Sequence, residues 1–595
     1  MKELKTNIVR LFAFMRPFRV KLVLAIVLAI VGAGLNALLP LFISDVIDYV
    51  TVHVTYVQEA IHSTIDIHVI ISHIFRIVAL VLVGQGATYF ANRFIATVIQ
   101  NTMKNIRTTV TDKLNRLPIA YFDKHQQGNI LSRVTNDIDN IGNALQQGLL
   151  TLITSMLTLV LVMIILTTIS WQVMLLTFTI VPGSIFFSQI IVKRSQSSFD
   201  NLQKALGELN GFIQEDYSGF EVIKLYGQEE TSEQAFDTIV NKITKHGFRG
   251  NFLSSLINPL SGIVTYGVYL IIAVYGGYLI INGNTQGQTV MTIGLLQACT
   301  QYVWQTSTPI SQIIEIVPGV QIIMAAAHRV FEVLDEPEEH DVENALHLPA
   351  QIEGNVVFDH VAFSYTKNKP LIADLSFEVH KGQTVAIVGP TGAGKTTLVN
   401  LLMRFYDINA GNIFIDGVPS SQVPRHEVRK QFGMVLQDAW LYQTSIRENI
   451  RFGRLDATDE EVVAAAKVAN VHEFILSLSD GYDTILNEET SNISQGQKQL
   501  LTIARAVLAD PKILILDEAT SSVDTRIELL IQNAMQKVMQ NRTSFVIAHR
   551  LSTVKNADLI LVIRDGAIIE QGTHKSLLQQ KGFYEELYNS QFVEE

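Results

Sequence analysis

The sequence predicts a chain of two unlike parts: an all-α domain of six transmembrane helices, followed by an α/β domain built around a phosphate-binding loop. The first supporting observation is a series of long uncharged stretches, all in the N-terminal half. The second is a glycine-rich loop placed between an apolar strand and a helical pattern. The third is the length of 595 residues, since one domain usually has ~100 to 200.

Composition agrees with a membrane protein. Hydrophobic residues make up 48% of the chain and charged residues 17%, so apolar residues are concentrated in blocks. The formal net charge of −11 argues against a nucleic-acid partner, which would require a basic surface. Cys299 is the only cysteine, so an intrachain disulfide is excluded.

The first predicted span has no charged residue from Leu22 to Ser44. At ~1.5 Å per residue this stretch exceeds the ~30 Å hydrocarbon core of a bilayer. A cleaved signal peptide is the alternative, but its apolar region would have only about 7 to 15 residues. We therefore expect a membrane-spanning helix.

Three further apolar blocks supply the other five spans. Residues 77–92 form one short span between two arginines, and residues 140–192 and 250–314 are uncharged and long enough for a helical hairpin each. Two long cytoplasmic loops are expected between these blocks. The membrane domain is predicted at 1–330, with helices at about 20–44, 70–95, 142–167, 172–193, 252–281 and 289–315.

The distribution of lysine and arginine predicts the orientation. Basic residues cluster before the first span, whereas residues 45–68 contain neither lysine nor arginine. Short cytoplasmic flanks carry the positive excess, so the N-terminus is expected in the cytoplasm, and six spans return the C-terminus there. Pro337 and Pro349 break the pattern that follows, which predicts a linker at 331–350 and a soluble domain at 351–595.

The soluble domain contains a complete phosphate loop. An apolar strand at 384–388 precedes the sequence GPTGAGKTT, and a helical pattern follows. Backbone N–H groups of such a loop approach phosphates, its lysine reaches the β and γ groups, and its first threonine ligates Mg²⁺. The predicted ATP-binding residues are Gly389, Pro390, Thr391, Gly392, Ala393, Gly394, Lys395, Thr396 and Thr397.

Two further strands end in polar residues. The strand at 513–516 leads to Asp517 and Glu518, and the strand at 544–547 leads to His549. Asp517 suits the Mg²⁺ shell together with Thr396, and Glu518 suits the general base that activates water. His549 is expected to contact the γ-phosphate, which makes Glu518 and His549 the predicted catalytic pair.

Taken in order, these elements resemble the ATP-binding cassette (ABC) family, and the resemblance covers nearly the whole chain. It implies that Tyr365 stacks on adenine and that Gln437 links the metal site to the membrane domain. It also implies that His549 is the switch histidine. The cofactors implied are ATP and Mg²⁺.

Four more motifs carry this resemblance. NISQGQKQL resembles the family signature, with Ser494, Gln495, Gly496 and Gln497 at its centre, and SSVD ends at Asp524 like the loop between two ATPase halves. In the N-terminal half, YFDKHQQGNILSRVTNDID and EDYSGFEVIKLYGQEE resemble the intracellular loops of ABC exporters. The resemblance implies an exporter fold in a bacterial cell membrane.

The signature departs from the family pattern LSGGQ, because Ile493 replaces leucine and Gln495 replaces the first glycine. The resemblance implies that this signature completes the ATP site of a partner half, and a bulky Gln495 hinders close approach to the phosphate. The chain's own site keeps Glu518. We therefore expect a heterodimer with one active and one impaired ATP site, with a homodimer as the alternative.

The expected function is ATP-driven export by one half-transporter, carrying amphipathic drugs or lipids by alternating access. An ATP-gated channel or regulatory membrane ATPase is one alternative, and a dedicated peptide translocator is another. No peptidase-like segment precedes the first span, which favours drug or lipid cargo over processed peptide.

Overall fold

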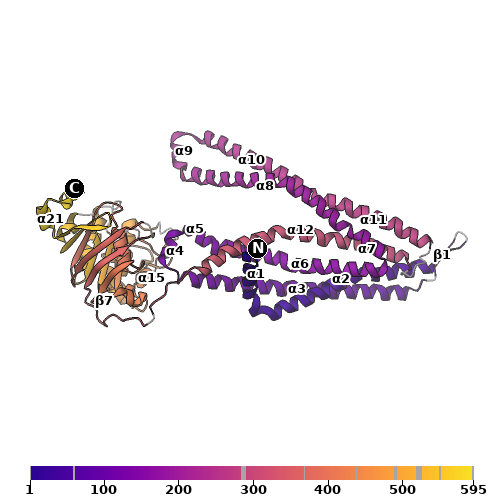
Figure 1. Cartoon of the computed structure of the whole chain (residues 1–595), viewed down its shortest axis with the longest axis horizontal. Helices are drawn as coiled ribbons and strands as arrows, with labels where there is room; N and C mark the ends of the chain where they lie inside the picture. The colour runs from indigo at the N-terminus through magenta and orange to yellow at the C-terminus, as the bar shows by residue number, and fades with distance from the viewer. Residues whose placement is uncertain are drawn as a thin grey trace. The chain divides into compact units, whose positions relative to one another are not determined.

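The computed structural model describes residues 2–57, 60–63, 65–282, 290–342, 344–366, 369–436, 439–487, 492–517, 525–548 and 551–591. The chain forms two compact units (Figure 1). The first comprises residues 1–115 and 127–336, and the second comprises residues 116–126 and 337–595. A short segment from within the N-terminal half therefore belongs to the C-terminal unit.

The first unit is helical. Among its described residues, six helical stretches are long and apolar enough to cross a membrane, as the charge pattern predicts. A small hairpin joins the first two. The elements are α1 Lys2–Met15, η1 Arg16–Phe18, α2 Arg19–His53, β1 Val54–Val57, β2 Ala60–Ser63, α3 Ile67–Leu114, α5 Gln127–Ser132, η2 Arg133–Asp137, α6 Ile138–Ile169, α7 Trp171–Phe178, α8 Ile180–Ser218, α9 Phe220–Tyr226, α10 Glu229–Ser255, α11 Ile257–Asn282 and α12 Ile293–Asp335.

The helices run well beyond the apolar stretches that predict them. Helix α3 has 48 residues, or ~70 Å at 1.5 Å per residue, against the ~30 Å of a hydrocarbon core. Helices α8 and α10 also extend beyond their apolar parts and run side by side, with α9 at their tip (Figure 1). The polar extensions contain residues that are compatible with a helix, so each helix continues past the expected membrane surface.

Helix α12 is tied to α2 at two levels. The fully buried Tyr302 donates its hydroxyl to the carbonyl oxygen of Ala37 at 2.8 Å. At the start of α12, the Asp48 carboxylate accepts hydrogen bonds from Thr292 Oγ1 at 2.6 Å and from Gly294 N at 2.8 Å. A carboxylate at a helix N-terminus is favourable because free N–H groups point toward it. These contacts fix the start of α12 against α2.

The second unit contains a six-stranded sheet in the order β12-β11-β5-β10-β9-β8, parallel except for β12, and a four-stranded antiparallel sheet in the order β4-β3-β6-β7. Helices cover the larger sheet. The strands are β3 Val356–Phe363, β4 Ile372–Val379, β5 Thr384–Val388, β6 Ala410–Ile415, β7 Val418–Pro419, β8 Phe432–Val435, β9 Ile513–Asp517, β10 Thr543–Ile547, β11 Leu559–Arg564 and β12 Ala567–Gly572. The helices are α4 Ile119–Lys124, α13 Lys395–Leu402, η3 Ser420–Gln422, α14 Arg425–Lys430, α15 Ile446–Arg451, α16 Asp459–Val468, α17 His472–Leu476, η4 Gly481–Asp483, α18 Gln495–Ala509, α19 Thr525–Met539, α20 Leu551–Asn556, α21 His574–Gln580 and α22 Phe583–Gln591.

The apolar strands of the larger sheet are buried on both faces. In β9, Ile513 and Ile515 pack into the core shared with the smaller sheet, whereas Leu514 and Leu516 pack into the core beneath α15 to α19. Alternate residues of a strand point to opposite faces, so a continuous apolar run is the expected pattern for such a strand. This double burial holds the carboxyl ends of β5, β9 and β10 at one edge.

Candidate nucleotide-binding site

The phosphate loop leaves β5 and enters α13 directly. Gly389, Gly392 and Gly394 have φ angles of 154°, 84° and 105°. Gly394 is the N-cap of α13 and has no side chain to bond the first N–H groups of the helix. Those donors are therefore left for an anion, and the helix dipole favours negative charge at the same point.

Gly389 is required by close packing as well as by backbone conformation. A Cβ atom added there would lie 2.1 Å from the carbonyl oxygen of Ile563 in the neighbouring strand β11. Behind the loop, Gly566 N donates to the carbonyl oxygen of Ala393 at 3.0 Å. The loop is thus held against the turn between β11 and β12, and Gly566 is a contributor that the sequence pattern did not single out.

Lys395 folds onto its own loop. Its Nζ atom donates to the carbonyl oxygens of Gly389 at 2.6 Å and Pro390 at 3.2 Å. Burial lowers the pKa of Lys395, and the Asp517 carboxylate acts on that pKa in the opposite direction. Asp517 therefore lies close enough to influence the ammonium, although more than a hundred residues separate the two in sequence.

Sheet order explains how Asp517 reaches this edge. Strand β10 lies between β5 and β9, and Asp517 is in register with Ile547 at the end of β10. Parallel strands present their carboxyl ends at one edge, where α/β domains bind ligands. The structure thus brings Lys395, Thr396 and Asp517 to the same region. Four predicted residues, Gln437, Glu518, Asp524 and His549, lie outside the described residues.

Tyr365 lies beside the phosphate-loop helix in a cluster of aromatic rings. Its hydroxyl is 3.2 Å from Thr397 Oγ1, and 45% of the residue is exposed. Its ring meets those of Phe363 and Tyr406 edge to face, with centroid distances of 4.8 Å and 5.0 Å. An exposed ring supported from behind in this way is suited to stacking on a planar base.

The signature residues begin helix α18. Ser494 is the N-cap: its side chain accepts from Gln497 N at 3.3 Å, while Ser494 N donates to the Gln497 side chain at 2.8 Å. This capping box satisfies two donors within the helix itself. Gln495 is exposed beside the cap, and Gly496 is buried.

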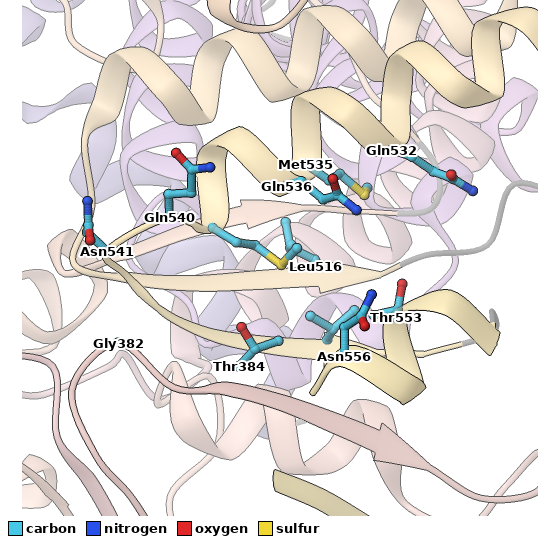
Figure 2. Close-up of a pocket in the computed structure, with 12 residues that line it drawn as sticks. Gly382, Thr384, Leu516, Gln532, Met535, Gln536, Gln540, Asn541, Thr553 and Asn556 are labelled. Atoms are coloured by element: carbon cyan, nitrogen blue, oxygen red, sulfur yellow. The ribbon is translucent and has the colours of Figure 1, made fainter. Parts of the chain in front are cut away.

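A separate cavity of about 380 Å³ lies in the same unit (Figure 2). It is lined by Thr384 at the amino end of β5, by Gln532 and Gln536 of α19, and by Gln540 just after that helix. The phosphate loop follows the opposite, carboxyl end of β5. This cavity is therefore distinct from the candidate nucleotide site.

Comparison with known proteins gives matches over both units. The family model for the ABC transporter transmembrane region matches residues 22–310, and the ABC transporter model matches residues 372–521. Together these two regions cover the long apolar helices and most of the nucleotide site.

Relatives extend the match along the chain. A fatty acid ABC transporter ATP-binding/permease protein of Mycobacterium tuberculosis is 46% identical over 506 residues, covering 85% of this chain and 79% of that protein. A putative multidrug export ATP-binding/permease protein of Staphylococcus aureus is 34% identical over 592 residues, covering 98% and 99%.

A solved structure agrees with the fold described above. A bacterial Atm1-family ABC exporter with ATP bound superposes with a TM-score of 0.75 at 28% identity, covering 96% of this chain and 98% of that one. The chain therefore belongs to the ABC transporter family, as a multi-pass membrane half-transporter of the exporter type whose C-terminal domain binds and hydrolyses ATP.

Proposed function

We propose that this half-transporter works in a heterodimer with one active and one impaired ATP site. The observation that carries the proposal is the exposed Gln495 beside the N-cap of α18. A partner nucleotide approaching Ser494 must pass a side chain where the family pattern has glycine. The adjacent helix donors are partly used by the capping box, so the anion site offered to a partner is weak.

The need for a second half is supported by helix α9. Phe220, Val222, Leu225 and Tyr226 are each more than half exposed on this helix of seven residues. Exposed apolar side chains that cluster among polar residues mark an interaction site. Covering α9 with a partner half removes this apolar area from water.

In the proposed active site, Lys395 and the N–H groups at the start of α13 hold the phosphates, and Tyr365 stacks on adenine. Thr396 and Asp517 supply a hydroxyl and a carboxylate, which are oxygen donors suited to Mg²⁺. Gln437 completes this metal shell, and Glu518 orients and deprotonates the attacking water. His549 contacts the γ-phosphate, and this chain's Asp524 belongs to the loop that lies between the two ATPase halves.

The proposed cargo is an amphipathic drug or lipid. The two relatives compared above are named for fatty acids and for multidrug export. Helices α6 and α12 also line an open cavity of about 530 Å³. Its described lining combines amides with aliphatic groups, a mixture suited to a molecule with a polar and an apolar end: Asn140, Asn143, Ala144, Gln147, Gly148, Thr151, Gln312, Ile316, Gly319 and Ile322.

The proposed setting is a bacterial cell membrane with both termini in the cytoplasm. Two ATP molecules close the ATPase domains, and closure drives the long helices from an inward-facing to an outward-facing arrangement. Energy enters through the higher affinity of the closed state for ATP. Hydrolysis at the active site then resets the pair.

Reconstituted vesicles test this proposal. Inside-out vesicles with the chain and its partner half should accumulate a fluorescently labelled fatty acid or Hoechst 33342 against a gradient when ATP is added. Mere equilibration would indicate a channel. For the heterodimer, the purified chain alone should hydrolyse ATP far more slowly than the pair, and robust turnover by a homodimer would contradict the asymmetric site.

A further inference from the structure

Three aromatic rings join the start of the C-terminal ATP-binding domain, called the cassette below, to the turn that follows the phosphate-loop helix α13. Phe363, Tyr365 and Tyr406 contact one another pairwise, with centroid separations of 4.8, 5.0 and 5.7 Å. Tyr365 is the proposed adenine-stacking ring. Tyr406 lies behind it, four residues after α13 ends at Leu402. A displacement of Tyr365 or of α13 therefore acts on Tyr406 directly.

The turn that carries Tyr406 is held firmly. Arg404 has a φ angle of 53°, and its buried guanidinium donates to the carbonyl oxygens of Ser420 and Val423. Two further hydrogen bonds connect the turn to the segment before Tyr365: Ser364 N donates to Asn409 Oδ1 at 2.7 Å, and Asn409 N donates to Ala362 O at 2.8 Å. The two segments are thus joined by backbone contacts as well as by rings.

On its other side, Tyr406 contacts helix α4. The Tyr406 hydroxyl donates a hydrogen bond to the Asp123 carboxylate, although 283 residues separate the two in sequence. Burial and the Asp123 carboxylate raise the pKa of Tyr406, so the phenol stays protonated and remains a donor. Residues 116–126, which contain α4, belong to the same compact unit as the cassette.

The linker leading into the cassette supports the same segment. Glu338 pairs with Arg116 at 3.0 Å, and Glu339 N donates to the carbonyl oxygen of Arg116 at 3.0 Å. Glu339 also forms two hydrogen bonds with Arg429 of α14, at 3.1 and 2.9 Å. One end of the segment is therefore attached to the linker, and its α4 end is attached to Tyr406.

We propose that Tyr406 is a positioning residue that transmits occupancy of the adenine site from Tyr365 to α4 through its hydrogen bond with Asp123. This inference rests on the proposed role of Tyr365. Adenine stacking restrains Tyr365, the edge-to-face contact restrains Tyr406, and the hydroxyl restrains Asp123. The contact is made by one hydroxyl, so Tyr406→Phe interrupts the transmission while keeping the ring that supports Tyr365.

Hydrogen–deuterium exchange on the full chain in lipid nanodiscs tests this without a known cargo. In a Glu518→Gln background, ATP and Mg²⁺ should slow exchange in peptides covering 389–402 and also in peptides covering 116–126. With Tyr406→Phe added, protection of 389–402 should persist, whereas the ATP-dependent slowing in 116–126 should fall by about fivefold or more. Asp123→Ala should give the same loss, and combining it with Tyr406→Phe should add nothing further.

Tyr482→Phe is the matched control, because it removes a phenol hydroxyl that contacts His472 Nδ1 at 2.8 Å elsewhere in the cassette. It should leave protection of both regions unchanged. Equal ATP-dependent protection of 116–126 in Tyr406→Phe and its parent would overturn the transmission role. Loss of protection at 389–402 in Tyr406→Phe would also overturn it, since Tyr406 would then act on binding itself. Absence of protection at 389–402 in the parent would instead reject ATP binding at the proposed site.

Discussion

Two helix N-termini in the cassette have opposite designs. At α13 the N-cap is Gly394, which has no side chain to cap the helix, and Lys395 follows it. At α18 the N-cap is Ser494, and a capping box with Gln497 uses the nearby donors. The first terminus therefore offers its N–H groups to a ligand, whereas the second partly satisfies its own.

The nucleotide site at the start of α13 is built by one chain. The signature surface at the start of α18 acts only on a nucleotide that a second chain holds. The α13 terminus gathers its positive charge and its nearby carboxylate, Asp517, from one sheet edge. The α18 terminus exposes Gln495 and has no lysine or arginine among its four signature residues. We infer that binding is a property of the half-transporter, and that closure is a property of the dimer.

The largest expected effect tests hydrolysis at the nucleotide site that this chain builds. Glu518→Gln should lower ATP turnover about 10²- to 10⁴-fold because it removes the general base, while ATP affinity stays unchanged. Steady-state ATPase and equilibrium binding of a fluorescent ATP analogue measure the two quantities. The exposed Glu460 in the first turn of α16 provides the control Glu460→Gln, which should retain turnover. Wild-type turnover in Glu518→Gln would exclude Glu518 as the base.

The second prediction tests the α18 end. Gln495→Gly should raise the ATPase rate of the chain purified alone by about tenfold, the value of one added hydrogen bond of ~1.4 kcal/mol to the phosphate. Gln495→Ala should give an intermediate gain, and Gln495→Asn, which keeps a polar side chain, should give little. An unchanged rate across this series would show that side-chain size at position 495 does not impair the site.

A smaller effect concerns pH at the α13 end. Burial lowers the pKa of Lys395, so its ammonium is lost at a lower pH than that of an exposed lysine. ATP affinity should therefore fall as pH rises from neutrality toward 10, because the neutral amine no longer attracts phosphate. Lys395→Arg stays charged over this range, and its affinity should be flat with pH. A flat profile in the unaltered chain would contradict this role of the ammonium.

The smallest expected effect is local stability at α18. Ser494→Ala removes the N-cap and should cost about 1 kcal/mol, which corresponds to roughly fivefold faster amide exchange in the first turn of α18. Thr573→Ala removes the equivalent cap of α21 and should accelerate exchange there instead. If neither α18 exchange nor ATPase changes in Ser494→Ala, the capping box does not compete with a nucleotide for these donors.

Much of the fold was predictable because its signals are local. Uncharged stretches located the six membrane helices, and the strands at 384–388, 513–516 and 544–547 appear as β5, β9 and β10. The residues at which the helices begin and end were harder to predict. Helix α3 continues to Leu114 because polar residues that permit helix follow its apolar part, and hydropathy reports only the part that faces lipid.

The parts of the candidate site that adjacent residues form could be predicted from the sequence. The contacts between residues far apart in the sequence, such as those of Tyr406, could not. The local sequence pattern from Gly389 to Thr397 is enough to predict the phosphate loop. Nothing local indicated Tyr406, whose importance depends on contacts with Tyr365 and Asp123.

The sequence by itself therefore determined the order of the two domains, the membrane spans and the phosphate loop, since apolar runs and glycine spacing act on neighbouring residues. Tertiary structure alone decided that Gly566 bonds the phosphate loop, that Asp48 accepts hydrogen bonds at the start of α12, and that residues 116–126 join the cassette. These contacts arise when whole helices and sheets pack, and packing between residues hundreds of positions apart leaves no periodic pattern in the chain.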